Sequence, residues 1–143
     1  MPSIFRSTCP VASALDIIGD KWSLLLVRDM LTVHKKTFKE FSESSEGIVP
    51  GILSSRLKWL EANSLLTKRK LPDNQKENVY LLTESGIELA PIIMDLILWS
   101  QKNLKSQNPG MPSFEEVGFD PKNPRLVELI QDSYRNFVAE TLS

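Results

Sequence analysis

The sequence predicts a mainly α-helical protein with one small antiparallel β-hairpin. Two observations carry this prediction. Apolar residues recur at helical spacing over most of the chain, and the period shortens to two only around residues 65–82, on either side of a polar turn. The length of 143 residues, with 41% hydrophobic and 24% charged side chains, suits one globular core and excludes a disordered chain.

The first two predicted helices are bounded by clear start and stop signals. Pro10 stands where a first helical position favours proline, and Gly19 supplies the stop, which predicts a helix over 10–18. Asp20 then caps a helix over 21–32. This second segment is apolar nearly all round, so we expect it to be the central helix of the core.

Two further short helices follow. Thr37 and Glu40 fit a capping box that opens a short helix, which we expect to bury Phe38 and Phe41. Pro50 opens the next helix, over 50–62. The leucines of that helix recur at helical spacing and predict its inward face: Leu53, Leu57 and Leu60.

The hairpin and a long helix come next. Strands are predicted over 65–71 and 78–82, around a polar turn at 72–77. Thr83 caps a helix over 84–103 that Pro91 should kink. One protomer core cannot use both apolar stripes of this helix, so we expect one stripe to face a second subunit. The predicted dimer contacts are Met94, Ile97, Leu98 and Trp99.

The chain loosens after residue 104. Four of the nine prolines fall within 109–124 and predict an extended connector. A last helix is expected over 125–142, packing on the dimer through Leu126, Ile130, Tyr134 and Phe137. The alternative is that this helix forms a separate effector or partner site. We therefore divide the chain into a helical and hairpin domain over 1–104 and an extension of that same domain over 105–143.

Several classes of function are excluded by the inventory of reactive side chains. The chain has one cysteine, Cys9, and one histidine, His34, so it can form neither an internal disulfide nor a Cys/His zinc site. No phosphate-binding, dinucleotide or hydrolase motif is present, and we predict neither an enzyme nor a cofactor. The sequence shows no secretory signal and no membrane span, which predicts a cytoplasmic protein without a membrane partner.

The order of the elements predicts a winged helix-turn-helix. Two short helices joined by a tight turn at 47–51, followed at once by a hairpin with a polar tip, are typical of this DNA-binding motif. Helix 50–62 would be the recognition helix and the hairpin the wing. The predicted contacts to double-stranded DNA are Pro50, Gly51, Ser54, Ser55, Arg56, Lys58, Lys68, Arg69, Lys70, Asn74, Gln75 and Lys76.

Charge is distributed unevenly along the chain. The net charge of −1 shows no overall attraction to a polyanion. Residues 50–82 nevertheless carry six cationic against three acidic side chains, whereas residues 106–143 carry three against six. Two interpretations of the basic strand remain: it contacts DNA, or it only makes an exposed strand soluble. The alternative function is a winged-helix protein–protein interaction module that does not bind DNA.

Several motifs together resemble one family, the HxlR-type transcriptional regulators, which are related to the MarR group. The resemblance covers about residues 8–102 and rests on Cys9–Val11, Ile18–Trp22, Phe38–Phe41, Gly47–Pro50, Leu53–Glu61 and Tyr80–Gly86, all in the family's order. It implies a homodimeric, sequence-specific DNA-binding regulator acting on a pseudo-palindromic operator. Val49 and Gly51 depart from the polar residues usual at their positions in the family, so Val49 cannot cap the recognition helix through its side chain.

Cys9 and His34 are considered separately. Cys9 stands at the predicted N-cap of the first helix, where backbone N–H groups favour a thiolate. The resemblance implies a candidate sensor of oxidants or electrophiles at this position, and an unidentified small-molecule effector is a further candidate partner. The alternative is a small structural cap. His34, beside two lysines, is expected in a solvated loop rather than as a ligand.

Overall fold

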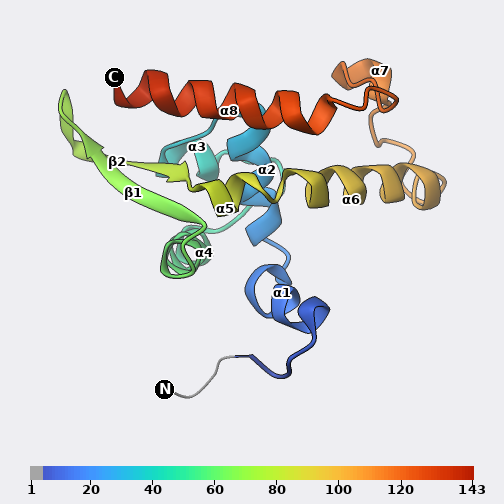
Figure 1. The fold of residues 1–143 in the computed structure, drawn as a ribbon, viewed down its shortest axis with the longest axis horizontal. Coiled ribbons are helices and arrows are strands. Elements are labelled where there is room, and N and C mark those ends of the chain that lie inside the picture. The colour runs from blue at the N-terminus through green and yellow to red at the C-terminus, as the bar shows by residue number, and fades with distance from the viewer. Residues whose placement is uncertain (1–4) are drawn as a thin grey trace.

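The computed structural model describes residues 5–143 (Figure 1). The structure confirms a mainly helical fold with a two-stranded antiparallel sheet. Its elements follow in the order α1 (Pro10–Ile18), α2 (Ser23–Val33), α3 (Phe38–Ser42), α4 (Pro50–Ala62), β1 (Leu66–Leu71), β2 (Asn74–Leu82), α5 (Glu84–Ile87), α6 (Ala90–Asn103), α7 (Phe114–Val117) and α8 (Leu126–Leu142). Within these residues no helix combines the length and apolar character that a membrane span needs.

Helix α2 forms the centre of the core, as its sequence predicts. Leu26, Val27 and Met30 are at most 3% exposed. The helix begins at Ser23, two residues later than predicted. The Asp20 carboxylate accepts hydrogen bonds from the backbone N–H groups of Trp22 and Ser23, both at 3.0 Å, so Lys21 and Trp22 form a capped turn before the helix.

The helix-turn-helix is formed by α3, residues 43–49 and α4. The predicted capping box is present, because Thr37 Oγ1 accepts from the Glu40 N–H and the Glu40 carboxylate accepts from the Thr37 N–H. Phe41 is fully buried, but Phe38 is 37% exposed, so its predicted burial is wrong. Helix α3 has little more than one turn and directs one aromatic ring into the core.

The hairpin is confirmed, but its turn is tighter than predicted. Strand β2 begins at Asn74 rather than at residue 78, and Leu66 pairs with Leu82 at the base. The register shifts between Lys70 and Leu71, so that the ladder skips residues 75–77 near the tip. The polar residues 75–77, predicted as part of a longer turn, thus lie in this irregular part of the hairpin. The hairpin projects away from the helices (Figure 1).

The long helix predicted over 84–103 is two helices, α5 and α6, so its predicted continuity is wrong. The break at Glu88 and Leu89 lies next to Pro91, the second residue of α6. Proline has no N–H to donate to the carbonyl four residues earlier, which is that of Ile87. Thr83 caps α5 as predicted, its side chain accepting from the Gly86 N–H.

Helix α8 packs on α2 and α6 of its own protomer, as Figure 1 shows at the top. That it also packs on a dimer stays a prediction. Tyr134 is fully buried, and its hydroxyl accepts a hydrogen bond from the Leu82 N–H at 2.8 Å. His34 ends α2 in a left-handed conformation and stacks on Phe137 with ring centroids 4.6 Å apart. His34 thus lies just after α2 as predicted, but it is half-buried rather than fully solvated, because aromatic rings of α8 contact it.

Candidate DNA interface

The exposed surface of α4 brings together most of the predicted recognition residues. Pro50 and Gly51 are exposed in its first turn, and a β-carbon added at Gly51 would meet nothing within 4 Å. The inward leucines are buried as predicted, so the polar side of the helix faces outward. One surface hollow is lined by Gly51, Ser54, Ser55, Arg56 and Lys58 together with Trp59 and Ala62.

Arg56 is held at the edge of this hollow by two neighbours. Its Nη1 lies 3.5 Å from Asp20 Oδ1, and its guanidinium lies 5.6 Å from the centre of the Trp59 ring. Burial opposes ionisation of Asp20, but hydrogen bonds from the Ser23 hydroxyl and two backbone N–H groups outweigh it and lower the pKa of Asp20. The Asp20 carboxylate is thus a stable anion beside α4, and it partly neutralises the charge of Arg56.

The start of α4 depends on the turn before it. Val49 is the N-cap and provides no side-chain hydrogen bond, as predicted. The turn is held instead by the Glu46 carboxylate, which accepts from Nη1 and Nη2 of Arg28 at 3.1 and 2.9 Å. This bidentate contact lowers the pKa of Glu46 to about 2. Gly47 follows with φ of 74°, a conformation that favours glycine.

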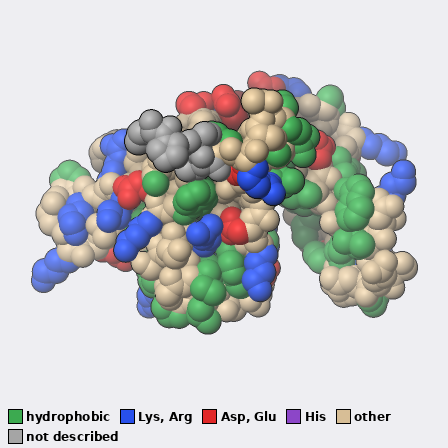
Figure 2. All heavy atoms as spheres, turned by 90° about the horizontal axis from the view of Figure 1, so that it is seen from below, with side chains coloured by type: hydrophobic (Ala, Val, Ile, Leu, Met, Phe, Trp, Pro, Cys, Tyr) green, Lys and Arg blue, Asp and Glu red, His purple; other side chains and the backbone are tan. Residues whose placement is uncertain are grey.

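The wing presents its predicted basic residues to solvent. Lys68, Arg69 and Lys70 are all exposed on β1, and Asn74, Gln75 and Lys76 are exposed at the tip. Within residues 5–143, no salt bridge involves any of these four cations or Lys58, so their charges are uncompensated. Figure 2 shows Lys and Arg side chains gathered over the hairpin end of the molecule.

Sequence reasoning missed two residues at the start of the recognition helix. Val49 is 52% exposed and Ile52 is 40% exposed. Ile52 stands three positions before Ser55, on the same exposed side of α4. This spacing in the sequence already indicates that Ile52 faces outward beside Ser55. Branched apolar side chains in the first turn of a recognition helix have the chemistry to contact a thymine methyl group.

The four predicted dimer residues on α6 differ in how far they are exposed. Met94 is buried in the protomer and Ile97 is half-buried, whereas Leu98 is 37% and Trp99 57% exposed. Ile92 and Leu96 are also exposed, and with Asp95 and Trp99 they line one surface hollow. Figure 2 shows hydrophobic side chains along this arm of the molecule, at the end away from the hairpin. Contiguous exposed apolar surface of this kind marks interaction sites.

Cys9 is exposed at the N-cap of α1, where the sequence placed it. Its backbone carbonyl accepts from the Ser13 N–H at 2.9 Å, and its side chain makes no capping hydrogen bond. The described part of the chain contains no cluster of His, Cys, Asp and Glu side chains that could hold a metal ion.

The sequence and the fold of this chain are similar to those of known proteins. The HxlR-like helix-turn-helix family matches residues 17–108. The HTH-type transcriptional regulator YodB of Bacillus subtilis is 30% identical over 98 residues, which are 68% of this chain and 87% of YodB.

Two solved structures are similar in fold and in sequence. The redox regulator HypR in its reduced form has a TM-score of 0.62 at 31% identity, covering 71% of this chain and 99% of HypR. Quinone-bound YodB from B. subtilis has a TM-score of 0.54 at 29% identity, covering 66% of this chain and 99% of that structure.

The matched residues include α2 to α6, and therefore the whole helix-turn-helix and its wing. The family consists of transcriptional regulators and not of enzymes, which agrees with the missing catalytic motifs. This chain belongs to the HxlR-like helix-turn-helix family.

Proposed function

We propose that this protein is a homodimeric regulator that binds double-stranded DNA in the cytoplasm, with α4 in the major groove and the hairpin on the flanking backbone. The observation that carries the proposal is the exposed polar surface of α4, with uncompensated cations on α4 and on the adjacent wing. Local positive potential, rather than overall charge, is what a DNA-binding surface requires. Two copies of α4 related by a two-fold axis would contact the half-sites of a pseudo-palindromic operator.

In this proposal the predicted contacts have different roles. Ser54, Ser55 and Arg56 contact bases or the nearest phosphates, and Pro50 and Gly51 let the backbone approach the groove. The cations that bind phosphate are Lys58, Lys68, Arg69, Lys70 and Lys76, while Asn74 and Gln75 contact the backbone at the wing tip.

The test is fluorescence anisotropy with a duplex from the region upstream of the chain's own gene, measured at several salt concentrations. If each dimer neutralises about six to eight phosphates, log K falls with log salt at a slope of about −5 to −7. Alanine at Lys68, Arg69 and Lys70 together should make the slope shallower by about 1 for each phosphate that the variant no longer neutralises.

The matched control removes three cations at the other end of the molecule, Lys102, Lys122 and Arg125, and should leave the slope unchanged. A slope near zero for the wild-type protein would contradict the DNA interface. Unchanged affinity in both the triple variant and Arg56→Ala would favour the alternative, a protein–protein interaction module that does not bind DNA.

We propose that the dimer forms through the exposed apolar side of α6, around Leu98 and Trp99 and extended to Ile92 and Leu96. Ile97 packs against the core of its own protomer, and Met94 is buried. Leu96→Glu should convert a dimer to a monomer in sedimentation equilibrium. Leu129→Glu is the control, because Leu129 is equally exposed, at 47%, but lies on α8. A dimer that survives Leu96→Glu and Trp99→Glu together would contradict this interface.

We propose Cys9 as an electrophile and oxidant sensor. The support is its exposed thiol at a helix N-terminus, together with relatives described as a redox regulator and as quinone-bound. With a quinone, the thiol gives its proton to solvent and the thiolate sulfur adds to a ring carbon. The hydrogen on that carbon leaves as a proton to one ring oxygen and a proton from solvent goes to the other, so the ring becomes a hydroquinone thioether and no outside oxidant is needed. With diamide, two thiols of a dimer lose two electrons and two protons and become a disulfide, while diamide is reduced to the hydrazine.

Either reagent should release DNA from the wild-type protein and not from Cys9→Ser. The mass of the intact protein reports the quinone adduct directly. Equal release from both proteins would contradict a sensor role for Cys9.

A further inference from the structure

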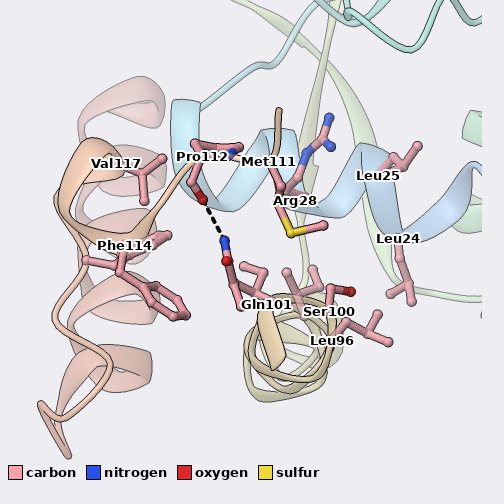
Figure 3. A pocket seen from close by; sticks show the side chains of 13 residues that line it. Leu24, Leu25, Arg28, Leu96, Ser100, Gln101, Met111, Pro112, Phe114 and Val117 are labelled. Carbon is pink, nitrogen blue, oxygen red and sulfur yellow. Dashed lines mark hydrogen bonds between the residues drawn. The ribbon is translucent and has the colours of Figure 1, made fainter. Parts of the chain in front are cut away.

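A cavity of 440 Å³ lies between α2, α6 and the segment 111–119 (Figure 3). Its volume falls within the range of about 300–1,000 Å³ that is usual for small-molecule sites. The lining is mostly apolar and comes from three separate parts of the chain. Leu24 and Leu25 of α2 lie on one side, Leu96 of α6 lies on another, and Phe114 of α7 closes a third.

The third wall of the cavity is fixed in place by polar contacts. Gln101 Nε2 donates to the Pro112 carbonyl at 2.5 Å, which Figure 3 shows as a dashed line. The Lys105 ammonium donates to the Met111 carbonyl. Ser113 then caps α7 by accepting from the Glu116 N–H. This wall lies beyond residues 17–108, the part of the chain that the family match covers, so the extension of this chain completes the cavity.

The charges around the cavity determine which ligand it can take. Arg28 is the only charged side chain among the described residues that line it. The guanidinium already binds two carboxylates, with Nε 2.9 Å from Asp29 Oδ1 and Nη2 2.9 Å from Glu46 Oε1. An anionic ligand would have to displace one of these carboxylates, whereas a neutral ligand meets apolar carbon and the polar groups of Ser100 and Gln101.

Arg28 also connects the cavity to the recognition helix. It lines the cavity and at the same time holds Glu46, which lies four residues before Pro50, the first residue of α4. Ile48, between them, is 5% exposed and is part of the core. A ligand packed against Arg28 therefore acts on the side chain that fixes the turn before α4.

We propose that this cavity is an effector site for a neutral, largely apolar small molecule, and that the Arg28–Glu46 ion pair transmits its occupancy to α4. The binding half of this proposal stands on the cavity alone. The transmission half rests on the proposed DNA-binding function.

Binding is tested with two dyes that share one skeleton. N-phenyl-1-naphthylamine is neutral, and 1-anilinonaphthalene-8-sulfonate is the same aromatic amine with a sulfonate. The neutral dye should bind once per protomer with a rise in fluorescence, and the sulfonate about tenfold more weakly or less, because its charge finds no unpaired cation. Preference for the sulfonate would overturn the neutral-ligand assignment.

A filled cavity provides the site-specific control. Ser100→Phe adds a ring to the lining and should weaken binding of the neutral dye by about tenfold. Ser106→Phe adds the same ring at an exposed position outside the cavity and should leave binding unchanged. Circular dichroism checks that both variants fold. Equal dye affinity in the wild-type protein and a folded Ser100→Phe would place the dye elsewhere and overturn the proposal.

Transmission is tested by adding duplex DNA. Saturating neutral dye should change DNA affinity by about fivefold or more, and saturating DNA must change dye affinity by the same factor. Glu46→Gln should keep dye binding and abolish this coupling. Dye binding without any coupling in the wild-type protein would leave an isolated ligand site and overturn the transmission half. If the protein binds no DNA at all, the dye titrations still decide the binding half.

Discussion

The side-chain amide of Gln131 donates a hydrogen bond to the carbonyl of Ile87 at 3.1 Å. This carbonyl is the one that Pro91 cannot serve, because a continuous helix would pair it with the N–H of residue 91. Helix α8 thus supplies the hydrogen bond that the α5–α6 break removes. The break before Pro91 and the side chain of Gln131 are therefore linked by one hydrogen bond.

The Gln131–Ile87 contact predicts a non-additive pair of substitutions. Gln131→Ala should lower the free energy of unfolding by about 1–2 kcal/mol, because it leaves the Ile87 carbonyl without a partner. In a Pro91→Ala background, residue 91 has its own N–H to donate, so the cost of Gln131→Ala should fall. A double-mutant cycle by urea denaturation measures the difference. Strictly additive effects would contradict the assigned pairing.

Tyr134 predicts a characteristic alkaline dependence. Burial raises the pKa of Tyr134 to about 12, from 10.0 for the free side chain. Between these values the unfolded chain ionises and the folded protein does not, so the contribution of Tyr134 to stability falls as pH rises, by about 1.4 kcal/mol per pH unit. Below pH 10 this contribution is fully present.

Tyr134→Phe should therefore cost about 1–2 kcal/mol at pH 8, by leaving the Leu82 N–H unpaired, and the cost should shrink above pH 10. Urea denaturation at each pH gives both values. Tyr80→Phe is the control for the hydrogen bond at pH 8, since no hydrogen bond of the Tyr80 hydroxyl is formed within residues 5–143. Above pH 10 it is not a control, because burial raises the pKa of Tyr80 as well. A cost of Tyr134→Phe that stays constant to pH 12 would contradict the burial effect.

Asp20 predicts a substitution that strengthens DNA binding. Asp20→Asn removes the negative charge 3.5 Å from Arg56 Nη1 while keeping an oxygen for the turn before α2. DNA affinity should rise by about threefold, because Arg56 no longer has to leave a carboxylate and one repulsive charge is removed. Glu128→Gln on α8 removes the same charge far from α4 and should have no effect. Anisotropy titrations compare the two, and equal gains would assign the effect to net charge alone.

Substitution of Gly51 should have opposite effects on stability and on DNA binding. Gly51→Ala adds a methyl group into open space on α4 and should stabilise the helix by up to about 1 kcal/mol. If the backbone approaches DNA here, the same methyl should weaken operator binding by about tenfold. Gly110→Ala is the control, because Gly110 also faces open space but lies in the connector. Unchanged affinity of a stabilised Gly51→Ala protein would show that DNA does not approach this residue.

Local signals predicted most of the fold, because the relevant chemistry lies within a few residues. The capping box at Thr37, the proline at position 50 and the polar hairpin tip each act over one turn of chain, and the structure contains all three. The differences from prediction have causes that no local pattern contains. Phe38 is exposed because α3 is short, and His34 is half-buried because it stacks on Phe137, far along the sequence.

In the candidate DNA interface, too, local features could be predicted from the sequence and tertiary contacts could not. The spacing of Leu53, Leu57 and Leu60 determined which side of α4 faces outward, and composition identified the basic wing. The hold of Asp20 on Arg56 depends on how α2 and α4 are placed in space. The cavity beneath the extension is also a tertiary feature, since its lining residues are scattered from position 24 to position 119.

The stack of His34 on Phe137 has a consequence for folding kinetics. The two rings are about a hundred residues apart in sequence, and closing a loop of that length costs conformational entropy before any contact repays it. Helices α3 and α4 and the hairpin are joined by contacts between neighbouring elements and can form early. Docking of α8 on α2 is then the late step, so substitutions at Phe137 should mainly speed unfolding, while those at Phe41 slow folding.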